Sequence, residues 1–134
     1  MVRRILIHEH NLFYYVDEMA TTPSLGEFEQ VVLLAILRLG DEAYGVTIGT
    51  EITTCTGREP TPGALYATLD RLEDKRLISS RLGDPTPQRG GRAKRYFTVT
   101  AIGVAAITRA QQSYRRLLEG CKVPGLTYAE SSLR

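Results

Sequence analysis

The chain of 134 residues contains no tryptophan and only two cysteines, Cys55 and Cys121. Two cysteines so far apart in sequence form neither a disulfide framework nor the paired spacing of a zinc site. We expect both to be buried free thiols, since free cysteine packs as a small hydrophobe. Histidine is equally scarce, and His8 and His10 have no third ligand nearby, so the sequence predicts no metal site and no cofactor.

Long apolar runs are also missing. A membrane-spanning helix needs roughly 20 apolar residues, whereas the longest apolar stretch, Val31–Leu39, already includes Arg38. Near the N-terminus, polar residues at positions 8–11 interrupt the continuous apolar region that a signal peptide requires. The sequence therefore predicts no membrane partner and a cytoplasmic location.

Charge of one sign is not in excess over the whole chain, because 17 basic residues face 15 acidic ones. The segment from Arg76 to Arg95 differs, with six basic residues against Asp84 alone, a net charge of +5. A basic cluster in a protein of ordinary net charge is typical of a nucleic-acid footprint. A solvated charged loop would have the same composition, so charge alone leaves both interpretations open.

Apolar residues at helical spacing predict two helices near the start of the regular part of the chain. The first, over 24–39, has Ser24 as its N-cap and Gly40 as its stop. The second runs from about residue 44 to 56 and is ended by Gly57. Its threonines and an internal glycine make this second helix intrinsically weak, so we expect tertiary packing to hold it.

A third helix is predicted to begin at Pro62, with Thr61 as its N-cap. Leu65, Leu69 and Leu72 recur at helical spacing and form its core stripe. A short turn joins this helix to the second one. Two helices linked in this way form a helix-turn-helix unit, whose second helix lies in the DNA major groove.

Two short segments rich in strand-forming residues follow, at 77–82 and 93–100. The residues between them, 83–92, contain too many glycines and prolines for regular structure, so we expect a two-stranded hairpin with a long tip. Thr100 then caps a last helix that runs to about Gly120. The predicted fold class is mostly α with a small two-stranded β-wing, a winged helix-turn-helix followed by one C-terminal helix.

The third helix, the wing and the start of the last helix also carry motifs that resemble those of the PadR family of bacterial regulators. The match covers about residues 25–120, and its order and spacing are more specific than any one piece. The resemblance implies a DNA-binding transcriptional regulator, usually a repressor, that dimerises through its C-terminal helix. The residues that carry it are Leu65-Tyr66-x-x-Leu69-x-x-Leu72-Glu73, Tyr44-Gly45, Arg89-Gly90-Gly91-Arg92-x-Lys94-Arg95-Tyr96 and Thr98-Val99-Thr100-x-x-Gly103.

One position departs from the family pattern. The family usually has a glycine where the chain leaves the third helix in a left-handed conformation, and this chain has Arg76. A non-glycine residue in that conformation costs about 1 kcal/mol. We therefore expect either local strain at Arg76 or a slightly different exit from the helix, with the fold intact.

The expected DNA contacts lie on two elements. Small side chains on the outer face of the third helix allow close approach to base edges, and its start favours a phosphate. Basic side chains around the glycine-rich wing tip suit phosphate or minor-groove contact, although Lys94 and Arg95 cannot both face DNA because side chains alternate along a strand. Alternatively, Thr61 is only a cap and Gly63 only a tolerated residue. The predicted contacts are Thr61, Gly63, Ala64, Tyr66, Ala67, Arg71, Arg89, Arg92 and Lys94.

The last helix carries an apolar stripe with spacings of three and four, typical of a short coiled-coil seam. We expect this stripe to join two chains, although it would look the same if it packed only on the first helix of its own chain. The stripe consists of Ile107, Ala110, Tyr114, Leu117 and Cys121. The expected division of the chain is an N-terminal extension without a clean pattern (1–23), a DNA-binding domain (24–100), a dimerisation helix (101–121) and a flexible tail (122–134).

These patterns predict a repressor that binds double-stranded DNA as a homodimer on a two-fold symmetric operator. An enzyme would need a nucleophile with a base, or a metal cluster, and the cysteines and histidines form neither. The alternative is a winged-helix module that binds protein without DNA, which would not require a basic wing. A small-molecule effector is a further partner that the sequence allows but does not identify.

Overall fold

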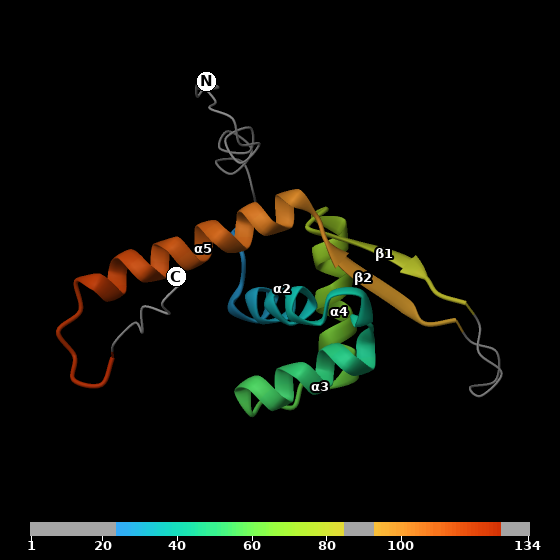
Figure 1. The fold of residues 1–134 in the computed structure, drawn as a ribbon, viewed down its shortest axis with the longest axis horizontal. Helices are drawn as coiled ribbons and strands as arrows, with labels where there is room; N and C mark the ends of the chain where they lie inside the picture. Colours follow the sequence, from blue (N-terminus) through green and yellow to red (C-terminus); the bar gives the residue numbers. More distant parts are fainter. Residues whose placement is uncertain (1–23, 85–92, 127–134) are drawn as a thin grey trace, which may run out of the picture.

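The computed structural model describes residues 24–84 and 93–126, and these contain four α-helices and one antiparallel pair of strands. Figure 1 shows the β-hairpin extending from one end of the helices and α5 extending from the other. This arrangement confirms the predicted winged helix-turn-helix. The elements are α2 (Glu27–Leu39), the single 3-10 turn η2 (Gly40–Glu42), α3 (Gly45–Thr56), α4 (Pro62–Asp74), β1 (Ile78–Leu82), β2 (Arg95–Val99) and α5 (Ala101–Glu119).

Helix α2 begins two residues later than the sequence suggested. Its N-cap is Gly26 and not Ser24, so the predicted cap is wrong. The reason is Glu29, whose Oε1 accepts the Gly26 N–H at 2.9 Å and so closes the first turn from inside the helix. At the other end, Gly40 has a φ of +58° and ends α2 as predicted.

The core lies where α2, α3, α4, the hairpin and the first half of α5 meet. Phe97, at the middle of β2, is 1% exposed and is among the largest fully buried side chains. Burial of this apolar surface is the main favourable contribution to folding. The core consists of Val32, Leu33, Ala35, Ile36, Ala43, Ile48, Ile52, Leu65, Leu69, Leu72, Leu77, Ile78, Phe97, Ala106 and Ile107.

Strands β1 and β2 are antiparallel, with Ile78 opposite Val99 at one end and Leu82 opposite Arg95 at the other. The hairpin is attached to the helix-turn-helix by a backbone hydrogen bond of 2.8 Å from the Phe97 N–H to the Ala43 carbonyl. Both strands are shorter than predicted. The expected hairpin tip falls mostly on residues 85–92, which lie outside the described residues.

The chain leaves α4 in the strained conformation that the sequence predicts. Arg76 has a φ of +61° and is the only non-glycine residue with a positive φ within 24–84 and 93–126. The N–H of Leu77, the next residue, donates to the Leu72 carbonyl at 2.9 Å. This bond closes the end of the helix across the left-handed residue, as a glycine would normally allow.

Both cysteines are exposed, so the prediction that they are buried is wrong. Cys55 lies on the outer side of the last turn of α3, where its thiol is 3.5 Å from a carboxylate oxygen of Glu51. Cys121 follows the end of α5. Each residue has the helical spacing of an apolar stripe, but among the described residues no neighbouring element covers the stripe at that point.

Helix α5 begins as predicted, with the Thr100 hydroxyl accepting the Gly103 N–H at 3.1 Å. Gly103 packs so closely on the backbone that a β-carbon there would collide with the Leu77 carbonyl oxygen. The first half of α5 therefore lies against the end of α4 and the hairpin. Its second half extends beyond the body of the domain (Figure 1).

Candidate nucleic-acid interface

The start of α4 has the geometry that the sequence predicts. Thr61 is in an extended conformation, with φ −66° and ψ 148°, and its hydroxyl accepts the Ala64 N–H at 3.2 Å. The Leu65 N–H is bonded to the Thr61 carbonyl at 3.0 Å, and Pro62 has no N–H. In this first turn, the Gly63 N–H therefore remains available to donate a hydrogen bond to a phosphate oxygen.

One face of α4 is exposed and the other is buried, as predicted. Gly63, Ala64 and Ala67 are exposed, whereas the leucine stripe is buried. Nothing lies within 4 Å of the position that a β-carbon on Gly63 would occupy. The fold does not require glycine there, and the surface of this half of the helix consists of small uncharged side chains that permit close approach.

The second half of α4 has a different surface. Arg71 is exposed, and one of its guanidinium nitrogens donates to the Thr68 hydroxyl at 3.1 Å, which holds its side chain along the helix. Asp70 and Asp74 are exposed on the same half. Carboxylates disfavour a nearby phosphate, so the first half of α4 is the better suited of the two to face DNA.

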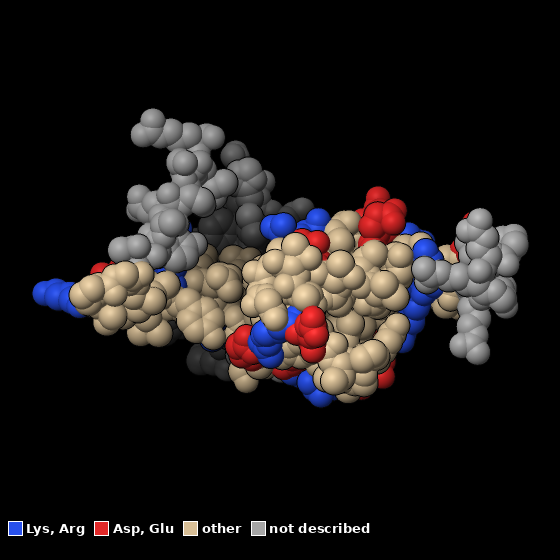
Figure 2. Space-filling model, turned by 90° about the horizontal axis from the view of Figure 1, so that it is seen from below, with Lys and Arg blue, Asp and Glu red and all other residues tan. Residues whose placement is uncertain are grey.

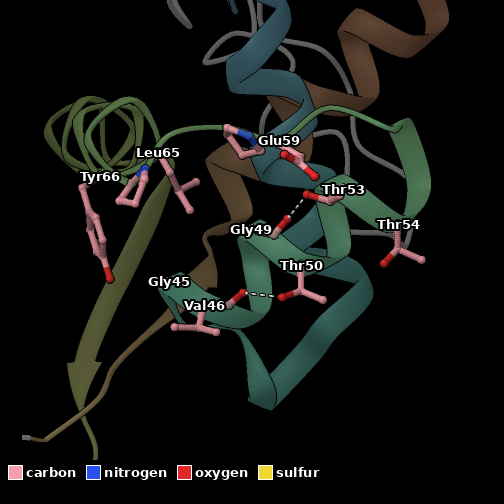
Figure 3. Close-up of a pocket in the computed structure, with 11 residues that line it drawn as sticks. Gly45, Val46, Gly49, Thr50, Thr53, Thr54, Glu59, Leu65 and Tyr66 are labelled. Carbon is pink, nitrogen blue, oxygen red and sulfur yellow. Dashed lines mark hydrogen bonds between the residues drawn. The ribbon is translucent and has the colours of Figure 1, made fainter.

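Tyr66 lies between α4 and the start of α3, as Figure 3 shows. Its side chain points toward Gly45, where a β-carbon would collide with the Tyr66 hydroxyl, and it remains 45% exposed. The ring thus packs against α3, the first helix of the pair, and the side chain stays partly exposed to a partner.

A groove of about 490 Å³ runs between α3 and α4 beside Tyr66 (Figure 3). Two of its threonine hydroxyls donate to backbone carbonyls one turn earlier, Thr50 to Val46 and Thr53 to Gly49, each at 3.0 Å. Bonds of this kind satisfy the hydroxyls but slightly destabilise a helix, so α3 depends on its tertiary packing. The groove is lined by Gly45, Val46, Gly49, Thr50, Thr53, Thr54, Glu59, Pro60, Pro62, Leu65 and Tyr66.

The wing carries basic side chains on both of its faces. Figure 2, which views the molecule from the α3 side, shows a band of Lys and Arg side chains at the hairpin end. The Lys94 ammonium lies 4.4 Å from the centre of the Tyr44 ring, and the Arg81 guanidinium lies 4.7 Å from the centre of the Tyr96 ring. Arg89 and Arg92, two of the predicted contacts, lie outside the described residues.

Arg95 is turned away from this surface, in agreement with the expectation that Lys94 and Arg95 do not face the same way. Its guanidinium forms an ion pair with Glu73 of α4 and lies 3.6 Å from a carboxylate oxygen of Asp70. The sequence reasoning missed both partners. The signal was present, because strand alternation separates Arg95 from Lys94 and helical spacing places the two acids on one side of α4.

The predicted seam on α5 is only partly open to another chain. Ile107 is 4% exposed and belongs to the core of its own chain, so its assignment to a chain-to-chain contact fails in this structure. Ala110 is half-buried, whereas Tyr114, Leu117 and Cys121 are exposed. The stripe is continuous, but its first part covers the domain and its last part lies beyond it.

An apolar groove lies on one side of α5 and a polar contact lies on the other. Leu34, Leu37 and Val104 are each about two-fifths exposed, and with residues of α5 they border a groove of about 320 Å³ between α2 and α5. On the opposite flank, the Tyr114 hydroxyl accepts a long hydrogen bond of 3.5 Å from the Gln30 amide. The sequence reasoning did not include the α2 residues of this region.

The far end of α4 is fixed to α2 by a largely buried ion pair. Lys75 donates to both carboxylate oxygens of Glu29, at 3.0 and 2.8 Å. Burial raises the pKa of Glu29, but the hydrogen bonds from Lys75 and from the Gly26 N–H outweigh burial and hold the pKa below its ordinary value. Glu29 is therefore ionised at neutral pH and anchors the exit of α4.

The described residues contain no cluster of three or more side chains that could hold a metal ion. Among the same residues, no helix combines the length and the apolar character needed to cross a bilayer.

A helix-turn-helix followed by a β-hairpin defines the winged-helix class, and comparison with known proteins identifies the family. The sequence pattern of the transcriptional regulator PadR-like family matches residues 33–109, more than half of the chain. The chain therefore belongs to the PadR-like family of transcriptional regulators. This result confirms the resemblance on which the sequence analysis relied.

Individual relatives and solved structures are similar to most of this chain. An uncharacterized protein of Lysinibacillus sphaericus, protein X, is 29% identical over 96 residues, which are 70% of this chain and 84% of the relative. The structure is similar to a PadR-like transcription factor from Bacteroides fragilis, with 25% identity, a TM-score of 0.57, and coverage of 69% of this chain and 84% of the other. A PadR family transcription regulator from hypervirulent Clostridium difficile shares the fold, at 24% identity and a TM-score of 0.55, with coverage of 69% and 92%.

Proposed function

We propose that this chain is a sequence-specific DNA-binding repressor that acts as a homodimer on a two-fold symmetric operator. The observation that carries the proposal is the outer face of α4. Its first half presents Gly63, Ala64 and Ala67 without any charge, and the wing carries Lys94 and Arg81 toward its tip end. Small side chains on a helix suit the major groove, and flanking basic side chains suit the phosphates.

The proposed roles follow this division. Ala64 and Ala67 face base edges, the Gly63 amide and the Thr61 cap receive a phosphate at the helix start, and Arg71 reaches the adjacent backbone. The Tyr66 hydroxyl donates a hydrogen bond to a phosphate oxygen. On the wing, Arg89, Arg92 and Lys94 contribute affinity without choosing sequence, because phosphate contacts carry no base information.

The homodimer is supported by the open half of α5. Tyr114 is 48% exposed and Leu117 is 70% exposed, on a helix that extends beyond its own domain. Exposed large apolar side chains that form a continuous surface mark an interaction site. A second copy, related by a two-fold axis, would cover this surface. Two recognition helices would then meet half-sites about 34–36 Å apart, one turn of DNA.

In this proposal residues 24–100 bind DNA and residues 101–121 join the two chains, while 1–23 and 122–134 have no assigned role. The protein is a cytoplasmic regulator without catalytic activity. Occupation of the operator blocks transcription until a signal changes the spacing of the two recognition helices. A small-molecule effector is one form that this signal could take.

The test is selection of operators from a random pool of double-stranded DNA by the purified full chain, followed by footprinting at fixed salt. We expect an enriched site with two-fold symmetry and a footprint of two half-sites on one face of the duplex. Transcription from a promoter that overlaps the site should fall when the protein is added. A protein that enriches no sequence would instead act as a protein-binding module, which is the competing interpretation. An asymmetric single half-site would contradict the homodimer alone.

A further inference from the structure

Arg95 is the centre of a closed hydrogen-bonded ring that links the wing to the recognition helix α4. Its Nε donates to the Ser80 hydroxyl at 3.0 Å, and its Nη2 forms an ion pair with Oε2 of Glu73. The Ser80 hydroxyl donates to the other oxygen of Glu73 at 2.7 Å. One residue of α4, one of β1 and one of β2 are therefore joined, and each of the three is hydrogen-bonded to the other two.

The guanidinium is also held from two further directions. It lies 5.1 Å from the centre of the Phe97 ring, and Phe97 is part of the buried core. On its other side, Oδ1 of Asp70 lies 3.6 Å from Nη1. Two carboxylates therefore oppose the charge of Arg95. A charge compensated in this way is poorly suited to replace the counterions of a DNA phosphate.

We infer that Arg95 is a positioning residue that fixes the angle between the wing and α4, and that this angle sets how well the protein discriminates its operator from other DNA. The inference rests on the proposed DNA binding and deepens it. A planar guanidinium that donates from two nitrogens, one to a serine and one to a carboxylate, fixes the orientation of β2 relative to α4. A lysine ammonium would not fix it in the same way. The wing and α4 must enter neighbouring grooves together, so a loose joint would have to be ordered on binding.

The ring makes this role separable from stability. Arg95 and Glu73 keep 40% and 32% of their side-chain surface exposed. Exposed ion pairs contribute little to folding free energy. Loss of the ring should therefore change the geometry of binding more than it changes the thermal midpoint of unfolding.

The experiment compares Arg95→Gln, Glu73→Gln and the double variant in the full chain. Each is titrated with operator and with random DNA over a range of salt concentrations. We expect both single variants to lower the ratio of operator to random affinity about tenfold, and the double variant to be no worse than either, because the two residues act as one unit. The slope of log affinity against log salt should not change. Arg95→Lys should lose part of the ratio although it keeps the charge.

Arg38→Gln is the matched control, since Arg38 also forms an ion pair with a carboxylate, Glu51, but joins α2 to α3 and not the wing to α4. It should leave the ratio unchanged. If Arg95 contacted phosphate instead, Arg95→Gln would make the salt slope shallower by about 0.9 for each site. In that case Glu73→Gln would tighten binding, because it removes a negative charge. That pair of results overturns the inference.

If the role of Arg95 were purely structural, both single variants would have a lower thermal midpoint of unfolding. At temperatures below that midpoint, their ratio of operator to random affinity would equal that of wild type. This result also overturns the inference. Failure of the proposed function looks different, because wild-type protein would then select no DNA sequence. A wild type that selects an operator, with variants that keep its affinity ratio, contradicts only the role of Arg95.

Discussion

Thr100 and Arg76 are joined by a hydrogen bond of 2.8 Å, which the Thr100 hydroxyl donates to the Arg76 carbonyl oxygen. Thr100 is the N-cap of α5, and Arg76 is the left-handed residue at which the chain leaves α4. The Thr100 N–H also donates to the Leu77 carbonyl at 3.0 Å. The exit of one helix and the entry of the next are therefore fixed to each other at a strained residue.

The strain at Arg76 predicts that Arg76→Gly stabilises the domain. A left-handed conformation costs an L-residue roughly 1–2 kcal/mol, and glycine relieves that cost. Glycine also makes the unfolded chain more flexible, which costs about 0.4–1 kcal/mol. We expect the free energy of unfolding to rise by up to about 1 kcal/mol, measured by urea denaturation. Arg76→Ala removes the same side chain but keeps the strain, so it should give no gain. Equal gains in both variants would show that the side chain, and not the backbone, is responsible.

The lowered pKa of Glu29 predicts a dependence of stability on acid. Because the folded state holds this pKa below 4.5, the ordinary value, the ion pair with Lys75 stabilises the fold above that pH and is lost as the pH falls. Glu29→Gln should lower the free energy of unfolding at pH 7 by about 1–3 kcal/mol, since it breaks a largely buried charged hydrogen bond. It should also make unfolding less sensitive to acidification from about pH 6 to pH 3.

Glu27→Gln is the control for this effect. Glu27 lies two residues earlier in α2 and pairs with Arg58 on the surface, where the two side chains are 69% and 47% exposed. It should change neither the stability nor its acid dependence by more than a few tenths of a kcal/mol. An acid dependence that is the same in wild type and Glu29→Gln would rule out Glu29 as its source.

The helices of the domain could be predicted because their end signals are local. Thr61 followed by Pro62 fixes the start of α4, and Gly57 fixes the end of α3 with a φ of +76°. Even the strain at Arg76 could be predicted, since it depends on one backbone conformation. The cap of α2 could not be read from Ser24, because the competing carboxylate of Glu29 comes from inside the helix.

The contacts between elements could not be predicted in the same way. The ring around Arg95 joins residues of three elements, and strand alternation alone indicated only that Arg95 and Lys94 face different ways. The burial of Ile107 depends on where α5 crosses the core, which periodicity does not determine. An apolar stripe at heptad spacing has the same sequence pattern whether it packs on its own domain or on a second chain. The sequence therefore showed which face of each helix is apolar, but it did not show which element or chain packs against that face.

The recognition helix offers two neighbouring positions with opposite expected effects. Ala67 is exposed on the proposed DNA face, whereas Leu69 is fully buried. Ala67→Glu should abolish operator binding by placing a negative charge against the duplex, with little change in thermal midpoint. Leu69→Ala should cost about 2–5 kcal/mol of folding free energy through the cavity it leaves. Gel shift and thermal unfolding of both variants check this pair. Normal operator affinity in Ala67→Glu would remove Ala67 from the interface.

The open half of α5 predicts that Tyr114→Glu separates the chains. A carboxylate there would have to be buried in an apolar contact between two copies, which is costly without a partner. Sedimentation at micromolar concentration should show a dimer for wild type and a monomer for the variant, with operator affinity falling in parallel. Gln112→Glu adds the same charge to the other side of α5 and should remain dimeric. A wild-type monomer, or a dimeric Tyr114→Glu, would contradict the assigned surface.

The wing tip supplies the last prediction, because glycines and arginines there suit a phosphate contact while a solvated loop would have the same composition. If Arg92 neutralises one phosphate, a dimer loses two contacts in Arg92→Ala. The slope of log affinity against log salt should then become shallower by about 1.8, at roughly 0.9 for each phosphate. Operator and random DNA should weaken alike, since backbone contacts carry no base information. A collapsed ratio with an unchanged slope would mean that Arg92 reads a base or the minor groove. If neither quantity moves, the wing does not bind DNA at this position.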